Sequence, residues 1–311
     1  MTDIAETIAA ITTKRVPPAV LSSREASPWR GLNYEDRMSR ETEWAMNESD
    51  AFFRDAGKVH ETLREITRRL TELGIPHAVV GGMALYRHGF RRSTEDVDLL
   101  VTPASLKRIH AELEGRGYLP PFARSKNLRD TQTGVKIEFL KTGEFPGDGK
   151  PKPIAFPDPV DVVEVRDGIP VVRLTTLVEL KIASGISSPD RRKDLADVQE
   201  LIKVLSLPAA FVNQLHSFVR DSFNQLWTEV HPGLKRYLRL WPCPLETSTP
   251  ITLGEIAKLD PSDTPILRSM QEAGVQIDTQ RDRVANGVWL VTTDPSIAAK
   301  YNMHDEAEFD D

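Results

Sequence analysis

The chain has 311 residues, of which 40% are hydrophobic and 28% are charged, and its formal net charge is −6. This composition is ordinary for a soluble globular protein and excludes a collagen-like or wholly disordered chain, while the net acidity argues against a basic nucleic-acid surface over the whole molecule but not against a local one. Apolar runs are too short for a membrane span, no secretory leader is expected, and the single cysteine, Cys243, fits a reducing cytoplasm.

At about 100–200 residues per domain, this length allows two domains. The polar, proline-containing segment 1–48 is expected to be an N-terminal arm with one short helix at 3–12. Residues 49–73 carry apolar side chains at spacings of three and four, so we expect one long helix there. Gly74 is expected to end that helix in a left-handed conformation.

The middle of the chain mixes strand and helix patterns. Strands are expected where β-branched or alternating residues occur, at 77–82, 95–101 and 135–141, with a hairpin over 160–174. Helices are expected at 83–88, at 103–116, from Thr175 or Thr176 through 183, at 191–205 and through 208–240. The stretch 145–153 is rich in proline and glycine and is expected to be a loop without regular structure, with a mobile run at 150–152.

A different pattern follows Pro242 and Pro244, and it predicts a small C-terminal α/β unit. Its expected helices and strands are 251–259, 263–274, 275–278 and 287–293, before an acidic solvated tail from 304. The expected division is an N-terminal arm (1–48), an α/β domain (49–205), a helical extension (206–245) and the C-terminal unit (246–311). The fold class predicted is α/β (α+β), with a small mixed sheet flanked by helices.

Asp96 and Asp98 are two residues apart on an expected strand, so their side chains point to the same face. Val97, Leu99 and Val101 would then face the core. Two adjacent carboxylates repel each other, and a divalent cation would resolve that conflict. Mg²⁺ prefers one or two carboxylates together with waters and phosphate oxygens, so the pair indicates a metal site.

Gly81-Gly82 and Glu138 extend this pattern. The two glycines lie between an expected strand and helix, where the backbone can approach a phosphate closely. Glu138 lies on the expected strand 135–141, and three carboxylates would converge if that strand lay beside the Asp96 strand. That layout is typical of two-metal phosphoryl or nucleotidyl transfer.

Gly-Gly, followed by Arg-x-Ser-Thr-x-Asp-x-Asp and an acid on a later strand, resembles the nucleotidyltransferase superfamily of the DNA polymerase β type. Within it, GGMALYRHGFRRSTEDVDLLV resembles the AbiEii-like nucleotidyltransferases, many of them toxins of toxin–antitoxin or phage-defence systems. A second match, in 174–202, places a lysine on a helix ahead of Arg-x-x-Asp-Leu-x-Asp. Its residues are Lys181, Arg191 or Arg192, Asp194 and Asp197.

The resemblance implies a nucleotidyltransferase fold and a set of site residues. Asp96 and Asp98 would bind Mg²⁺ (or Mn²⁺), with Glu138 as the third acid where the family more often has Asp. Gly81 and Gly82, where the family often has Gly-Ser, would hold the triphosphate. Other residues expected to contact the nucleotide or act in catalysis are Arg91, Arg92, Thr94, Lys181 and Asp194.

The expected reaction transfers a nucleoside monophosphate from a nucleoside triphosphate to an acceptor hydroxyl. The resemblance makes a tRNA 3′ end the leading acceptor, in a cytoplasmic toxin or phage-defence protein with a possible cognate antitoxin and no membrane partner. Protein side chains and small molecules remain open as acceptors. A basic approach surface for RNA is expected from Arg91, Arg92, Arg124, Lys126 and Arg129.

Simpler interpretations remain for each part of the pattern. Asp-x-Asp alone is typical of a solvated face, Glu138 can be a surface acid, and Asp194 can pair with neighbouring cations. His88 is more often structural, and the aromatic residues of 227–241 are expected in the core. The alternative function is a non-catalytic, nucleotidyltransferase-fold protein of a defence system that binds a nucleotide or a partner. A short antitoxin-type enzyme that modifies a toxin is ranked last.

Overall fold

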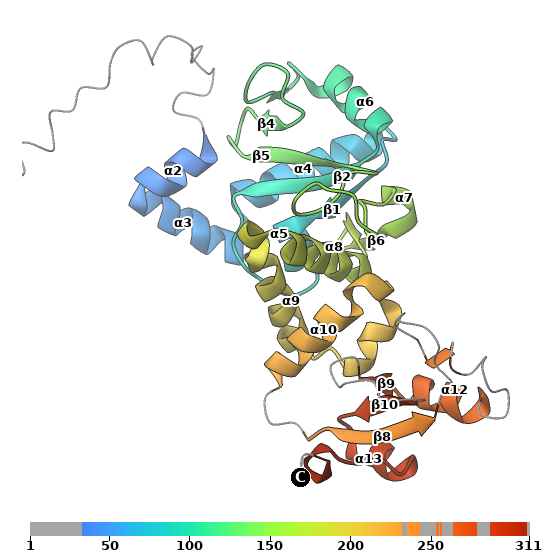
Figure 1. The fold of residues 1–311 in the computed structure, drawn as a ribbon. Helices are drawn as coiled ribbons and strands as arrows, with labels where there is room; N and C mark the ends of the chain where they lie inside the picture. The colour runs from blue at the N-terminus through green and yellow to red at the C-terminus, as the bar shows by residue number, and fades with distance from the viewer. Residues whose placement is uncertain are drawn as a thin grey trace, which may run out of the picture.

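A computed structural model describes residues 33–231, 235–242, 253–254, 256, 264–278 and 287–309. The helix expected at 3–12, Cys243 and most of the helix expected at 251–259 lie outside these ranges. Within them the protein has a mixed α/β architecture, in which helices flank a mixed sheet (Figure 1).

The main sheet has seven strands in the order β3-β4-β5-β2-β1-β7-β6. Its strands are β1 (His77–Val80), β2 (Asp96–Val101), β3 (Tyr118–Leu119), β4 (Leu128–Asp130), β5 (Lys136–Lys141), β6 (Val163–Arg166) and β7 (Ile169–Val172). β2 pairs antiparallel with β1 and parallel with β5, and β1 pairs parallel with β7. The strands expected at 77–82, 95–101 and 135–141 and the expected hairpin are therefore confirmed.

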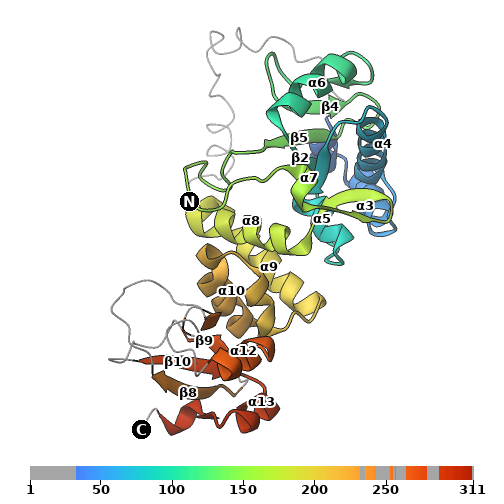
Figure 2. The same ribbon diagram turned by 90° about the vertical axis from the view of Figure 1, so that its right-hand side faces the viewer.

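Helices cover both faces of this sheet. α4 lies on the side of the sheet opposite to α8 (Figures 1 and 2). The helices of this part are α2 (Tyr34–Arg40), α3 (Thr42–Phe53), α4 (Lys58–Glu72), α5 (Gly81–Arg87), α6 (Pro103–Leu113), α7 (Pro159–Val162), α8 (Leu174–Ser187), α9 (Arg192–Val204) and α10 (Ser217–Val230). Short 3-10 turns occupy η2 (Pro189–Arg191) and η3 (Ala209–Gln214).

Alternation along β2 fixes which face of the strand is buried. Val97, Leu99 and Val101 have no solvent exposure and belong to the main hydrophobic core, as predicted. Full burial of such side chains stabilises a fold by about 1.5–3 kcal/mol each. Asp96 and Asp98 consequently face the other side of the sheet, toward α8.

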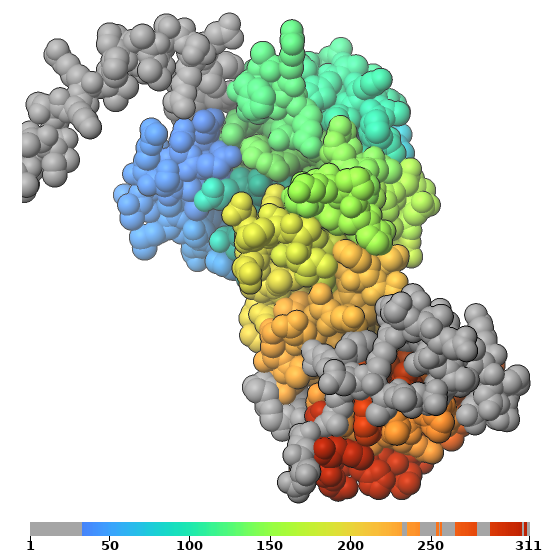
Figure 3. All heavy atoms as spheres, viewed as in Figure 1, coloured from blue at the N-terminus to red at the C-terminus, as the bar shows by residue number. Residues whose placement is uncertain are grey.

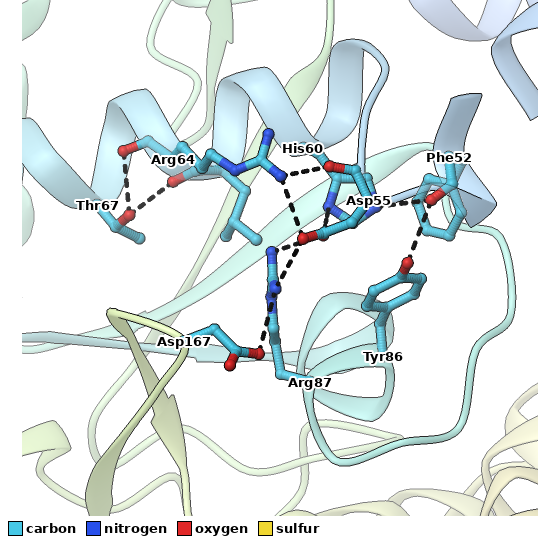
Figure 4. Close-up of polar contacts among 9 residues, drawn as sticks. Phe52, Asp55, His60, Arg64, Thr67, Tyr86, Arg87 and Asp167 are labelled. Atoms are coloured by element: carbon cyan, nitrogen blue, oxygen red, sulfur yellow. Dashed lines mark hydrogen bonds and ion pairs between the residues drawn. The ribbon is translucent and has the colours of Figure 1, made fainter.

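The N-terminal part differs from the expectation. Two helices, α2 and α3, occupy residues that were expected in an arm, and their Tyr34 and Phe52 are buried in the main core. The long helix expected at 49–73 is two helices, because Asp55 (φ 60°) and Gly57 (φ 85°) take left-handed conformations. The Asp55 carboxylate there receives Arg87 and His60, both at 3.0 Å (Figure 4). A tertiary ion cluster thus interrupts a helical pattern.

The C-terminal part has its own sheet and core. Its elements are β8 (Tyr237–Pro242), α12 (Thr264–Glu272), β9 (Gln276–Ile277), β10 (Gly287–Thr292), α13 (Pro295–Lys300), β11 (His304–Asp305) and η4 (Glu306–Glu308). The strands follow the order β11-β8-β10-β9. Trp241, Leu267 and Leu290 are buried in a cluster separate from the main core. The prediction of a helix through 240 is wrong from Tyr237 onward, because these residues form β8.

The tail expected from 304 is solvent-exposed in part, as at His304 and Glu308, but it begins as a strand of the sheet. His304 and Asp305 pair with β8, and Asp305 also binds Lys235 at 2.7 Å. The proposed domain boundaries stay predictions. Within the described ranges, every helix is too short or too polar to cross a membrane.

Candidate functional site

Three carboxylates meet on one face of the main sheet. β2 and β5 pair in parallel with Asp98 opposite Glu138 and Asp96 opposite Lys136. Because these residues occupy alternate positions on their strands, Asp96, Asp98 and Glu138 share a face, and one oxygen of each lies within 4.8 Å of the others. The predicted convergence of three acids is therefore confirmed.

The electrostatics of this acidic cluster (Asp96, Asp98 and Glu138) favour a cation. Burial, together with the nearby charges of Asp96 and Glu138, raises the pKa of Asp98 to about 8. A divalent cation would remove this repulsion, and carboxylate oxygens in this number are ligands that Mg²⁺ and Mn²⁺ accept. The residues present thus fit a divalent metal ion.

The two glycines allow the β1–α5 turn to pass directly beside the acids. Gly81 has φ 63°, and a Cβ atom there would lie 1.9 Å from Oδ2 of Asp98. A Cβ on Gly82 would lie 2.7 Å from Cβ of Thr94. Thr94 in turn donates a hydrogen bond of 2.7 Å to Oδ1 of Asp96. The first role of Gly-Gly is therefore to make room for the oriented carboxylates.

Lys181 on α8 lies in a buried charge network. Its side chain is 8% exposed, and Nζ donates to Oδ1 of Asp194 at 2.8 Å and to Oδ2 of Asp197 at 2.7 Å. Burial acts to raise the pKa of Asp194, but Lys181 and the hydroxyl of Ser184 hold it below its ordinary value. Arg92 completes the network, with Nε 2.8 Å from Oδ1 of Asp197. Two cations thus balance two acids.

Most of these groups line one pocket, whose cavity volume is about 180 Å³. Figure 3 shows the surface hollowed on this side, between the green and yellow segments. The predicted residues that line it are Gly81, Gly82, Arg92, Thr94, Asp96, Asp98, Glu138, Lys181 and Asp194. Arg91 is not among them, since its guanidinium lies over the ring of Tyr86, 5.4 Å from the centroid.

Arg191 and Lys193 add positive charge to the lining of this pocket. In the part of the chain that the structure describes, neither forms an ion pair, although the charge of Arg191 contributes to lowering the pKa of Asp194. The ion-pair partner of Asp194 is Lys181. Both cations are available to an anionic ligand.

The loop 145–153 is a wall of the pocket. Gly147 (φ 75°) packs against α8 so closely that a Cβ would lie 2.2 Å from Oγ of Ser187. The side chain of Lys152 is 8% exposed and binds Asp148 at 2.6 Å. The stretch 145–153 has no regular secondary structure, as expected, but it packs against α8 and does not stand free of the fold. Pro146, Gly147 and Phe156 line the pocket, and sequence reasoning missed all three because proline and glycine indicate a turn without showing what it packs against.

The expected basic approach surface is wrong at Arg129. This side chain is buried and pairs with Glu35 at 2.7 Å, so it fastens α2 to β4. Lys126 is exposed and lies 3.4 Å from Glu144, and Arg124 is exposed. His88 is buried against the carbonyl oxygen of Val172, at 2.8 Å, as its structural interpretation predicted.

Comparisons with known proteins assign no family. No family model matches the sequence, and no curated protein matches it. Solved structures overlap with about half of the chain. The structure of ANT(2″)-Ia in complex with adenylyl-2″-tobramycin has a TM-score of 0.35 at 11% identity, covering 55% of this chain and 98% of that one.

Two Helicobacter pylori structures overlap to a similar extent. JHP933 has a TM-score of 0.32 at 17% identity, over 56% of this chain and 77% of its own. A putative nucleotidyltransferase has a TM-score of 0.32 at 18% identity, over 55% of this chain and 79% of its own. TM-scores of this size do not assign the chain to a family.

Proposed function

We propose that this protein is a divalent-cation-dependent nucleotidyltransferase that moves a nucleoside monophosphate from a nucleoside triphosphate to an acceptor hydroxyl. The observation that carries the proposal is the acidic cluster, three carboxylates within 4.8 Å of one another in a pocket that also holds unpaired cations. A site that takes a metal ion and a polyphosphate needs both signs of charge close together.

Each side chain has a proposed part in this reaction. Asp96 and Asp98 would hold Mg²⁺ or Mn²⁺, which when bound offsets negative charge on the phosphate oxygens. Arg191 and Lys193 would bind the outer phosphates, while Gly81 and Gly82 let the nucleotide approach the backbone. The acceptor oxygen bonds to the α-phosphorus as the bond from that phosphorus to pyrophosphate breaks. Glu138 is the proposed acceptor of the hydroxyl proton.

Lys181 and Asp194 are proposed to position the pocket wall. Their ion pair fixes α9 against α8 and holds Arg92 through Asp197. Lys181 also lowers the pKa of Asp98, which shows that its charge reaches the acidic cluster. A phosphate that enters the pocket would meet this charge without displacing the network.

The finer proposal is a cytoplasmic toxin or phage-defence enzyme of the AbiEii-like type, with a tRNA 3′ end as acceptor and a cognate antitoxin as partner. The Gly-Gly and Asp-x-Asp segments and the Lys181–Asp197 segment support it. With Arg129 buried, the basic residues open to RNA are reduced to Arg91, Arg124 and Lys126 beside the pocket cations.

The test combines the purified chain with Mg²⁺, each α-labelled nucleoside triphosphate and total tRNA. We expect label on RNA with the wild-type protein and none with the Asp96→Asn/Asp98→Asn double variant. Glu112→Gln is the matched control, because Glu112 is a surface acid that pairs with Arg116 on α6. Equal labelling by the double variant would refute a catalytic role for the two acids.

A second function has one observation in its favour. The cations Lys181 and Lys136 are already bound to acids of the protein itself, as in a site that does not turn over. A non-catalytic protein that binds a nucleotide or a partner would show saturable nucleotide binding and no transfer to RNA, protein or small-molecule acceptors.

A further inference from the structure

Lys136 is the sheet residue whose positive charge directly contacts an acid of the acidic cluster. It lies on β5, two positions before Glu138 and therefore on the same face. In the β2–β5 register it stands directly opposite Asp96. Its Nζ forms an ion pair with Oε1 of Glu138. Lys136 is thus a neighbour of two of the three acids.

This placement makes Lys136 part of the site although it does not line the pocket. Its side chain is 29% exposed and that of Glu138 is 31% exposed, so the pair is half-buried. This ammonium is the cation in direct contact with Glu138. An ammonium and a divalent cation cannot both occupy the same carboxylate without repelling each other.

We propose that Lys136 is an internal counter-cation of the acidic cluster, which competes with the divalent cation for Glu138 and so sets the affinity of the metal site. This inference rests on the proposed function, because it requires that the cluster binds a metal ion. Lys136 is a positioning residue, since it acts through Glu138 and does not touch substrate.

An alternative partner for Lys136 lies on α2. The charge of Glu35 reaches Lys136, and Glu35 already binds Arg129 at 2.7 Å. Its side chain is 32% exposed, so it can accept a second cation without further burial. When a metal ion takes Glu138, the ammonium can turn toward Glu35. The N-terminal helix α2 would thereby contribute to the metal affinity of a site that it does not line.

The test measures Mn²⁺ binding to the full chain by calorimetry, without nucleotide. We expect Lys136→Gln to bind Mn²⁺ about 2- to 5-fold more tightly than wild type, the range that a half-exposed ion pair allows. Lys136→Arg keeps the charge and should bind as wild type does. Lys141→Gln is the matched control, because Lys141 is on the same strand but pairs with Glu144 at 2.6 Å.

A second variant keeps the test independent of how well Lys136→Gln folds. Glu35→Gln removes the alternative partner and should weaken Mn²⁺ binding by about 2-fold. Because Glu35 also binds the buried Arg129, Arg129→Gln is the control for loss of that pair and should leave Mn²⁺ binding unchanged. Unchanged or weaker binding by Lys136→Gln, or unchanged binding by Glu35→Gln, would overturn the inference and leave the proposed function standing. Absence of Mn²⁺ binding by the wild-type protein would overturn both.

Discussion

Two clusters of charged side chains in the same domain differ in how their charges balance. Around Asp55, one carboxylate receives Arg64, Arg87 and His60, and Asp167 adds a second acid beside Arg87 (Figure 4). In the acidic cluster, three carboxylates share one ammonium, that of Lys136. The first cluster is complete and joins elements of the fold. The second has more carboxylates than cations in contact with it, and a bound divalent cation would balance the excess.

Each of the two clusters contains a residue in the left-handed backbone conformation, but for different reasons. Asp55 takes a left-handed conformation to reach its partners, and Gly81 takes one to make room for Asp98. Non-glycine residues in this conformation cost about 1–3 kcal/mol, which the surrounding contacts must offset. At Asp55 the contacts with Arg64, Arg87 and His60 supply the offset. Gly81 has no side chain and so avoids this conformational cost. Of the two positions, only Gly81 cannot accept a Cβ atom, because that atom would collide with Asp98.

The largest effect is expected from Gly81→Ala. Its methyl group would collide with Oδ2 of Asp98 and displace one ligand of the proposed metal site. We expect Mn²⁺ affinity to fall about 10- to 100-fold in calorimetry, as for other losses of ligand support. Gly115→Ala is the control, because Gly115 has φ 76° but no atom within 4 Å of the added Cβ. If both variants bind Mn²⁺ equally, the close approach of Gly81 does not matter.

A smaller effect, on stability alone, is expected from Arg87→Met. The Arg87 side chain is 4% exposed, and its loss leaves Asp55 with weaker partners. We expect a loss of about 2–3 kcal/mol in the free energy of unfolding by urea, less than for a fully buried pair because Asp55 is partly exposed. Arg64→Met, at an exposed position, should cost less than about 1 kcal/mol. Lost Mn²⁺ binding in Arg87→Met would contradict the separation of the two clusters.

The smallest expected effect is a pH dependence of stability from His60. Burial lowers the pKa of His60 from 6.5 to about 4, with Asp55 opposing the shift. Between these values the unfolded chain binds the proton and the folded chain does not, so stability is present above about pH 6.5 and falls on acidification. From pH 7 to 5 the loss is about 2 kcal/mol. His60→Gln should flatten this part of the urea-unfolding profile, and an unchanged slope would contradict the assignment.

The acidic cluster could be predicted from the sequence because the alternation of residues along each short strand shows which side chains share a face. Alternation along two short strands places Asp96, Asp98 and Glu138 on a face, and only the pairing of the strands had to be assumed. The structure shows that the two strands pair in parallel with Asp98 opposite Glu138, which brings the three acids together. Lys181 and Asp194 were identified through the family resemblance, but their mutual ion pair depends on how α8 and α9 pack.

The errors lie where distant residues decide the outcome. An arginine such as Arg129 is expected at the surface. It is buried here because it forms an ion pair with Glu35, which is distant in the sequence. The strand β8 follows a segment with helical spacing, and its state is decided by β10 and β11, which follow it in the chain. Tertiary pairing overrides local propensity in such cases. Packing of Gly147 against α8 belongs to the same class.

The parallel pairing of β2 with β5 has a consequence for synthesis of the chain. Parallel neighbours need a crossover, here the segment with α6, β3 and β4, so Asp98 cannot meet Glu138 until β5 has left the ribosome. Lys181 and Asp194 emerge later still. An N-terminal fragment released early would carry Asp96 and Asp98 without their neighbours. A chain truncated before β5 would therefore lack the three-carboxylate cluster altogether.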